Sequence, residues 1–303
     1  MPRICVIFNP AARGEKALRF RSHLASLSEQ CTLKPTFAAG SGRQLAAEAV
    51  REGFDIVVAA GGDGTLNEVL NGICDAEVGR VCPSAPLKTC LGVLPLGTVN
   101  VFAKELNLPT RLKDAWQIIC AGKQTIIDLP YAQFTLNGLA QKRYFAQMAG
   151  AGWDSRAIEL VDWQHKKQIG GLAYVVAGLK ALRGRMPQIL VTVGKETLTG
   201  ELVLIGNGRF YGGRYHVFPL ADLRDSLLEV SIVPKVNIQG ILRSGWGLLT
   251  NQLYTSGGLR HFKAETISLY SADPVPFHVE GENVGPLPAT FSVQPRALRV
   301  IVP

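Results

Sequence analysis

The chain has 303 residues, of which 47% are apolar and 18% are charged, and its formal net charge is +8. This length suits two domains, and the composition supports packed cores and excludes an intrinsically disordered chain. No window approaches the run of about 18 apolar residues that a transmembrane helix needs, so we expect none.

The first part of the chain alternates strand and helix signals. Apolar runs closed by turn residues predict buried strands at 3–8, 33–38, 55–60 and 90–95. Helical spacing of apolar residues predicts helices at 15–27, 42–52 and 65–73. This alternation predicts a doubly wound, Rossmann-like parallel sheet with helices on both faces, over residues 1–127.

The signal changes after residue 127. Turn residues separate most of the predicted strands, which are 126–136, 142–147, 188–193, 197–206, 227–233, 266–270, 276–280, 289–293 and 298–302. Two helices are predicted among them, at 156–183 and 237–253. This pattern predicts a β-rich second domain over residues 128–303, an antiparallel sandwich or barrel.

The net charge and the cysteines indicate which ligands and which cellular compartment suit the chain. The positive excess is spread along both halves of the chain, which favours phosphate-bearing substrates or an anionic membrane surface. No nucleic-acid-binding motif is present, so we expect no nucleic acid partner. The six cysteines lie in the first 120 residues and form no CxxC pair or Cys/His cluster, which predicts a reducing compartment and no zinc site.

The most informative segment is the loop Gly61–Asn67, which follows the strand at 55–60 and opens a helix. Its three glycines allow a sharp turn and a close approach of a ligand, and the helix N-terminus attracts phosphate. Thr65 suits an N-cap or a hydrogen bond to phosphate, and Asp63 suits Mg²⁺ or an acceptor hydroxyl. A tight turn without a ligand is the alternative, but this loop at the end of a parallel strand favours nucleotide binding.

Two other strand ends carry similar turns. Gly97 and Thr98 follow the strand at 90–95, and Asn9 with Pro10 follows the first strand. Because the carboxyl ends of parallel strands meet at one edge of a sheet, we expect these turns and the Gly61–Asn67 loop to form one cleft.

Six segments carry a family pattern in order along the chain: FNPAARG at 8–14, GGDGTLNEVLNG at 61–72, LPLGTVNVFAKEL at 94–106, KKQIGGLAY at 166–174, PLADLRDSLLEV at 219–230 and EGENVG at 280–285. Together they resemble the diacylglycerol kinase catalytic-domain family, which includes bacterial lipid kinases and sphingosine and ceramide kinases. The resemblance covers nearly the whole chain.

The resemblance implies an ATP-dependent lipid kinase of phospholipid metabolism, with ATP in the cleft between the domains. Such an enzyme transfers the γ-phosphate of ATP to a hydroxyl of a membrane-derived lipid, such as diacylglycerol or a sphingolipid. It implies Mg²⁺ bridging the phosphate oxygens, since phosphoryl transfer depends on positioning and charge neutralisation. The implied nucleotide contacts are Gly61, Gly62, Asp63, Gly64, Thr65, Leu66, Asn67 and Thr98, with Asn9 as a further candidate.

The same resemblance implies a metal site in the segment 219–230. Its ligands map to the carboxylate of Asp225 and to the backbone carbonyls of Asp222 and Leu227. Oxygen ligands of this kind suit Mg²⁺ or Ca²⁺. Without the resemblance, this segment predicts only a polar turn between strands.

The implied catalytic base lies in the triplet Glu280–Glu282, where the family usually has Asp-Gly-Glu. Glu280 keeps the carboxylate and adds one methylene, so we expect it to accept the proton of the lipid hydroxyl, with Asp63 as the rival base. Two other positions depart from the family: Val101 stands where Asp is frequent, and Ala38 falls near an expected nucleotide-contacting Thr.

The segment 163–185 carries five basic residues and no acidic one beside an apolar helical pattern. This pattern favours peripheral docking on an anionic membrane surface, and a packed helix with a solvated basic face is the alternative. We therefore expect a cytoplasmic protein at the inner face of the membrane with a lipid substrate, and leave a homodimer open.

Two other functions stay open. A soluble kinase related to NAD kinase also carries a Gly-Gly-Asp-Gly loop. An ATP-binding regulator without catalysis is suggested by the departures at Glu280, Val101 and Ala38. Transfer of phosphate from ATP to extracted lipids, compared with transfer to NAD, separates these alternatives.

Overall fold

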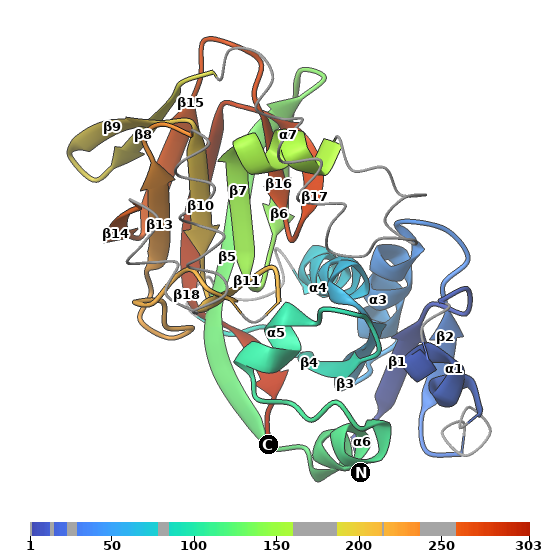
Figure 1. Cartoon of the computed structure of the whole chain (residues 1–303). Helices are drawn as coiled ribbons and strands as arrows, with labels where there is room; N and C mark the ends of the chain where they lie inside the picture. The colour runs from blue at the N-terminus through green and yellow to red at the C-terminus, as the bar shows by residue number, and fades with distance from the viewer. Residues whose placement is uncertain are drawn as a thin grey trace.

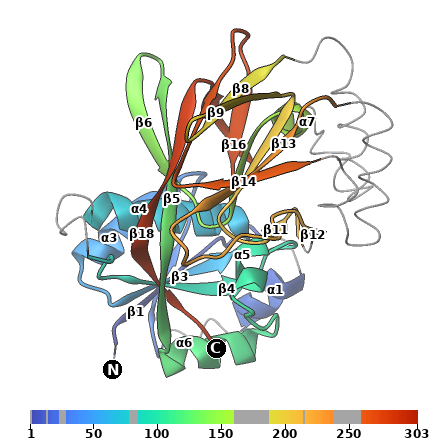
Figure 2. The same ribbon diagram turned by 90° about the vertical axis from the view of Figure 1, so that its left-hand side faces the viewer.

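The computed structural model describes residues 2–12, 15–22, 29–77, 85–159, 187–213, 215–236 and 259–303. These residues form an α/β lobe and a β-rich lobe (Figure 1). The long antiparallel strands β5 (Gln124–Leu136) and β18 (Ala289–Ile301) run side by side from one lobe into the other (Figure 2). The predicted α/β fold with a second, β-rich sandwich is confirmed.

The α/β lobe is built on four parallel strands in the order β2 (Thr32–Pro35), β1 (Ile4–Phe8), β3 (Ile56–Gly61) and β4 (Cys90–Pro95). One face of this sheet packs on helices α3 (Ser41–Arg51) and α4 (Asp63–Glu77). The other face packs on α1 (Glu15–Ser22) and α6 (Leu112–Ala121).

Strand β1 shows why its sequence is apolar throughout. Cys5 and Ile7 belong to the core under α3 and α4, whereas Ile4, Val6 and Phe8 belong to the core on the opposite face. All five side chains are buried. A strand covered by helices on both faces has no solvent side, so its sequence is a continuous apolar run without alternation.

The β-rich lobe has two packed sheets. The first continues the sheet of the α/β lobe from β4 through β18 to β15 (Thr266–Tyr270), β8 (Ile189–Val193) and β9 (Glu196–Gly200), with β5 and β6 (Leu139–Tyr144) paired alongside. The second has the order β14 (Arg260–Ala264), β13 (Leu228–Val233), β10 (Leu202–Gly206), β7 (Met148–Gly152), β16 (Pro276–Val279) and β17 (Glu282–Pro286). A short ribbon of β11 (Phe210–Tyr211) and β12 (Tyr215–His216) stands apart.

A single apolar core fills the space between these two sheets. Phe277 of β16 meets Phe291 of β18 edge to face, with ring centroids 5.6 Å apart, and both rings are fully buried. Aligned sheets that share such a core form a β-sandwich. The first sheet thus belongs to both lobes. Because the second sheet packs on it, the position of the end of β16 relative to the α/β lobe is fixed.

Several predicted boundaries differ from the structure. The predicted strand 197–206 is two strands, β9 and β10, because the chain turns at Glu201. The predicted strands 289–293 and 298–302 are one strand, β18, whose pairing with β5 shifts register between Gln294 and Leu298. Most of the predicted helices 156–183 and 237–253 lies outside the described residues, which include only α7 (Trp153–Glu159).

The structure bears on two predictions, one about transmembrane helices and one about the cysteines. None of the described helices is long and apolar enough to cross a membrane. Five of the cysteines fall in the described ranges and carry no disulfide: Cys5, Cys31, Cys74, Cys90 and Cys120.

Candidate active site

The turn after β3 leads directly into helix α4, as the sequence predicts. The helix begins at Asp63, and Leu66 N–H donates to Gly62 O at 3.0 Å. The N–H groups before this bond have no partner further back in the helix, because the first turn of any helix leaves its amides free. The turn therefore presents amide donors and the positive end of a helix of 15 residues.

The turn after β4 packs backbone against backbone on this loop. A Cβ atom built on Gly97 would lie 2.4 Å from Gly62 Cα, so only glycine fits at residue 97. Buried Asn100 holds the same turn, since its side chain accepts from Gly97 N–H at 3.0 Å and donates to Gly97 O at 2.6 Å. The predicted approach of the two turns is therefore seen, and Asn100 is the residue that fixes it.

Asp63 joins the loop to the short helix α5 (Val101–Glu105). Its Oδ1 accepts from Val101 N–H at 2.8 Å. Burial raises the pKa of the Asp63 carboxyl, and the backbone N–H donors of residues 100–102 lower it. One oxygen of the Asp63 carboxylate is thus bound to the start of α5.

Glu280 lies in a tight turn between β16 and β17. Its φ is 52°, and that of Gly281 is 79°. Glu280 Oε1 accepts from the backbone N–H groups of Ala146 and Gln147, both at 2.7 Å, and Glu280 N–H donates to Met148 O at 2.9 Å. The carboxylate is therefore buried and rigidly placed, and the hydrogen bonds to its side chain in the described structure all engage Oε1.

The Glu280–Glu282 turn of the β-rich lobe faces the Gly61–Asn67 loop of the α/β lobe. A Cβ atom built on Gly64 would lie 2.9 Å from Glu282 Oε1. Burial, with a further contribution from the charge of Asp63, raises the pKa of Glu280 to about 8. The carboxylates of Glu280 and Asp63 and the N-terminus of α4 thus meet where the lobes touch.

The remaining predicted nucleotide contacts border this meeting point. Thr98 is exposed in the turn after β4, and Thr65 is half-buried in the first turn of α4. Asn67 is buried, and Leu66 packs into the core under α3 and α4. Asn9 is exposed at the end of β1, where its Oδ1 accepts from Ala11 N–H at 2.8 Å. Their contacts with nucleotide stay predictions.

The predicted metal segment forms a turn between the lobes. Asp225 Oδ1 accepts from Leu227 N–H at 3.0 Å, and Asp222 Oδ1 accepts from Arg224 N–H at 3.0 Å. Lys263 Nζ contacts Asp225 Oδ2 and donates to Leu220 O at 2.6 Å. Within the described chain, no group of three His, Cys, Asp or Glu side chains is placed to hold a metal.

This arrangement does not fit a divalent ion at Asp225, because the ammonium group of Lys263 already neutralises that carboxylate. The set of Asp222, Asp225 and Leu227 remains a prediction, and a metal there would have to displace Lys263.

Asn71 of α4 is a contact between lobes that the sequence analysis did not find. Its Nδ2 donates to Tyr144 O and its Oδ1 accepts from Tyr144 N–H, both at 2.9 Å, and its side chain is fully buried. One amide thus pairs both backbone groups of a β6 residue 73 positions away. The only sequence signal was its place within GGDGTLNEVLNG.

We expect Asn71→Ala to lower the free energy of unfolding by about 2–4 kcal/mol, because it leaves two buried backbone groups unpaired. Urea denaturation measures this change. Gln44→Ala, which removes an exposed amide from α3, is the control and should change stability by about 0.5 kcal/mol or less. Equal stabilities of the two variants would contradict the assignment.

His278 begins a second buried network that the sequence analysis missed. Gly281 N–H donates to Nδ1 at 3.3 Å, so Nε2 carries the ring proton and donates to Asp154 Oδ2 at 2.7 Å. Tyr211 OH donates to the same oxygen at 2.9 Å. The network ties the Glu280 turn to the start of α7 and to β11.

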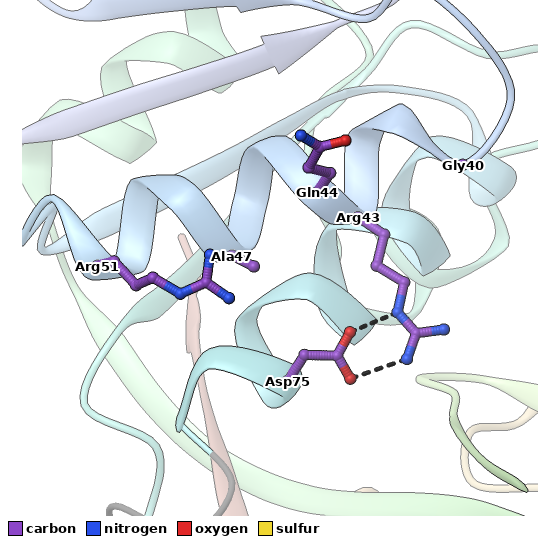
Figure 3. Close-up of a pocket in the computed structure, with 6 residues that line it drawn as sticks. All are labelled: Gly40, Arg43, Gln44, Ala47, Arg51 and Asp75. Carbon is purple, nitrogen blue, oxygen red and sulfur yellow. Dashed lines mark hydrogen bonds and ion pairs between the residues drawn. The ribbon is translucent and has the colours of Figure 1, made fainter.

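A surface hollow of about 320 Å³ lies over helices α3 and α4 (Figure 3). In it, Arg43 of α3 points toward Asp75 of α4 and forms two hydrogen bonds, at 2.5 and 2.8 Å. This ion pair satisfies the charges of Arg43 and Asp75, so neither group is free for chemistry. The predicted membrane segment 163–185 lies outside the described residues.

Two protein-family models match this chain. The profile described as "Diacylglycerol kinase catalytic domain" matches residues 3–132, and that described as "YegS C-terminal NAD kinase beta sandwich-like domain" matches residues 147–302. The chain belongs to the diacylglycerol kinase catalytic-domain family. The resemblance that the motifs predicted is therefore confirmed.

Relatives of this family match over nearly their full lengths. A protein named diacylglycerol kinase from Staphylococcus saprophyticus is 29% identical over 99% of this chain and 95% of its own. Another of that name, from Bacillus subtilis, is 28% identical over 100% of this chain and 97% of its own. A solved structure of a diacylglycerol kinase from Bacillus anthracis str. Sterne has a TM-score of 0.75 at 20% identity, and it covers 100% of this chain and 97% of that chain. The similarity to this solved structure, at 20% identity, shows the fold alone.

Proposed function

We propose that this chain of the lipid kinase family transfers the γ-phosphate of ATP to a hydroxyl of a membrane-derived lipid. The observation that carries the proposal is the meeting of the Gly61–Asn67 loop with the buried carboxylate of Glu280 across the two lobes. A helix N-terminus binds phosphate, and a fixed carboxylate beside it suits proton removal from an acceptor hydroxyl.

The free backbone N–H groups of the turn after β3 and of the first turn of α4, before the bonded Leu66 N–H, would bind the ATP phosphates. Close packing of Gly97 on Gly62 keeps this loop in one shape, and Asn100 and Asp63 hold the turns on either side. Such preorganisation matters because phosphoryl transfer depends mainly on positioning and charge stabilisation. Mg²⁺, held with the phosphates near Asp63, would neutralise the charge that develops on the phosphate oxygens.

Glu280 would accept the proton of the lipid hydroxyl, and Asp63 is the less suitable base. Oε1 of Glu280 accepts from two backbone N–H groups, and no hydrogen bond in the described structure engages Oε2. Asp63 lies in the first turn of α4, inside the loop that would bind the phosphates, and its Oδ1 accepts from Val101 N–H. We therefore assign nucleotide positioning to Asp63 and proton transfer to Glu280.

The lipid substrate places the protein at a membrane surface. We propose peripheral association with the cytoplasmic face of an anionic membrane, on the basis of the basic segment 163–185. Diacylglycerol and sphingolipids both offer a suitable hydroxyl, and names of relatives at about 28% identity support the kinase family rather than one lipid.

The test is transfer of label from radiolabelled ATP to a total lipid extract, with the product identified by mass. A labelled phosphomonoester lipid supports the proposal. Label on NAD and not on lipid would support the soluble-kinase alternative. Binding of ATP with no transfer to either acceptor would support a regulator without catalysis.

His278 is expected to position the Glu280 turn. His278→Gln keeps a donor to Asp154 but loses the acceptor for Gly281 N–H, so we expect kcat to fall about 10–100-fold with an unchanged KM for ATP. Steady-state kinetics measures both constants. His278→Asn, which keeps an acceptor near the position of Nδ1, should recover part of kcat. A wild-type kcat in His278→Gln would refute the positioning role.

A further inference from the structure

A basic groove lies where strands β5 and β18 cross from one lobe to the other. It measures about 470 Å³ and is lined by Gln124, Thr125, Ile126, Arg224, Arg296 and Arg299. Val300 of β18 lies opposite Thr125 and beside Leu91, near the amino end of β4. The candidate active site lies at the carboxyl end of β4, about 13 Å further along the strand at 3.3 Å per residue. The groove is therefore a separate feature.

An irregularity in strand β18 brings Arg296 into this groove. The pairing of β18 with β5 shifts register between Gln294 and Leu298, and Arg296 has a φ of 48°. A positive φ is uncommon for a residue other than glycine, and β-bulges re-aim side chains. Buried Asp128 stabilises this conformation, because its Oδ1 accepts from Arg296 N–H at 2.7 Å.

Within the described ranges, the three arginines have no acidic partner. Arg299 Nε donates to Leu87 O at 3.2 Å, and among the described residues no ion pair engages Arg224, Arg296 or Arg299. This contrasts with Arg43 in the hollow of Figure 3, which pairs with Asp75.

The carboxylates nearest to the groove are already engaged. Asp128 accepts from the backbone N–H groups of Ser226 and Arg296, and Asp225 contacts Lys263. Asp222 accepts from the backbone N–H of Arg224. Three guanidinium groups that line one groove repel one another when the nearby carboxylates are engaged elsewhere, and a bound anion relieves this repulsion.

We propose that this groove binds a phosphate group. Guanidinium groups bind phosphate oxygens with paired N–H donors, and Thr125 and Gln124 supply further hydrogen-bond donors beside them. Free phosphate and the headgroup of an anionic phospholipid present the same chemistry. The proposal does not depend on the kinase activity, because the groove shares no residue with the Gly61–Asn67 loop or the Glu280–Glu282 turn.

Calorimetric titration with inorganic phosphate tests the groove. The titrations use the full chain carrying Gly62→Val, so that the glycine-rich loop does not contribute to binding. Adding Arg224→Gln and Arg296→Asn should weaken phosphate binding tenfold or more, and Asn is chosen because it tolerates a positive φ. The control removes the same charge elsewhere, with Arg51→Gln and Arg111→Gln, and should bind phosphate as before. Equal affinity in the two sets of variants, or no phosphate binding at all, would overturn the proposal.

Vesicles separate the two sources of phosphate. Sedimentation with phosphatidylcholine vesicles, with and without phosphatidylglycerol, is measured for the same variants. Anionic vesicle binding that falls with the loss of Arg224 and Arg296 identifies a lipid headgroup as the ligand. Vesicle binding that is equal in both sets, together with a lost phosphate site, identifies a free anion.

Discussion

Replacing Gly97 with alanine is expected to lower phosphate transfer roughly 100-fold or more and to weaken ATP binding, because it forces the two loops apart. The added Cβ would lie 2.4 Å from Gly62 Cα and 2.7 Å from Asn100 Oδ1. Neither neighbour can move freely, since one is backbone and the other is held by the hydrogen bonds of the turn. Overpacking of this kind also lowers the free energy of unfolding by about 1–3 kcal/mol.

The matched variants are Gly62→Ala and Gly62→Val. A Cβ on Gly62 would lie 3.4 Å from Gly97 Cα, an ordinary contact, so Gly62→Ala should leave the melting temperature unchanged. The larger Gly62→Val should prevent ATP binding, because its side chain stands where the phosphates would approach. Thermal unfolding and nucleotide titration measure the two effects. If Gly97→Ala melts and binds ATP like wild type, the two turns do not form one phosphate loop.

The parts of this fold that the sequence predicted are those fixed by local patterns. Strand β4 was predicted with its observed bounds, Cys90–Pro95, because a strand buried on both faces is a continuous apolar run. The sharp strand-to-helix turn was predicted because glycines between a strand and a helix allow few alternatives, but the helix begins at Asp63, two residues before the predicted residue 65. In each case the physical cause lies within about ten residues of sequence.

The contacts that complete the site depend on packing between distant segments. Asp154 and His278 are 124 positions apart, and nothing near either residue indicates their pairing. Lys263 lies 38 positions from Asp225, so sequence reasoning assigned that carboxylate to a metal without its ammonium partner. Such pairs exist only once the two sheets of the sandwich are placed, and they were therefore missed.

The pKa of Glu280 makes two dependences on pH testable. Burial raises this pKa from 4.5 to about 8 in the folded protein, so folding favours the protonated carboxyl. The contribution to stability is therefore complete below about pH 4.5 and is lost as the pH rises through about 8. Glu280→Gln removes this group, and its unfolding free energy should fall less than that of wild type between pH 5 and about 9. Urea denaturation across this range measures the difference.

Glu280→Gln is also expected to lower turnover by roughly 10²–10⁴-fold while ATP affinity stays unchanged. The amide keeps the size of the side chain and an oxygen to accept from Ala146 and Gln147 N–H, but it cannot take a proton. Because a base must be ionised, wild-type kcat should rise with pH to a midpoint near 8, the pKa of Glu280. The control is Glu196→Gln, the same change at the exposed first residue of β9.

Asp63→Asn distinguishes the two carboxylates at saturating ATP and lipid. If Asp63 positions nucleotide, Asp63→Asn raises the KM for ATP and keeps the pH midpoint of kcat near that of wild type. If Asp63 is the base, Glu280→Gln keeps near wild-type turnover and only Asp63→Asn is inactive. We expect the first outcome, because Asp63 opens helix α4 inside the loop that would bind the phosphates, whereas Glu280 lies across from that loop on the β-rich lobe and has a pKa of about 8, which suits proton transfer near neutral pH.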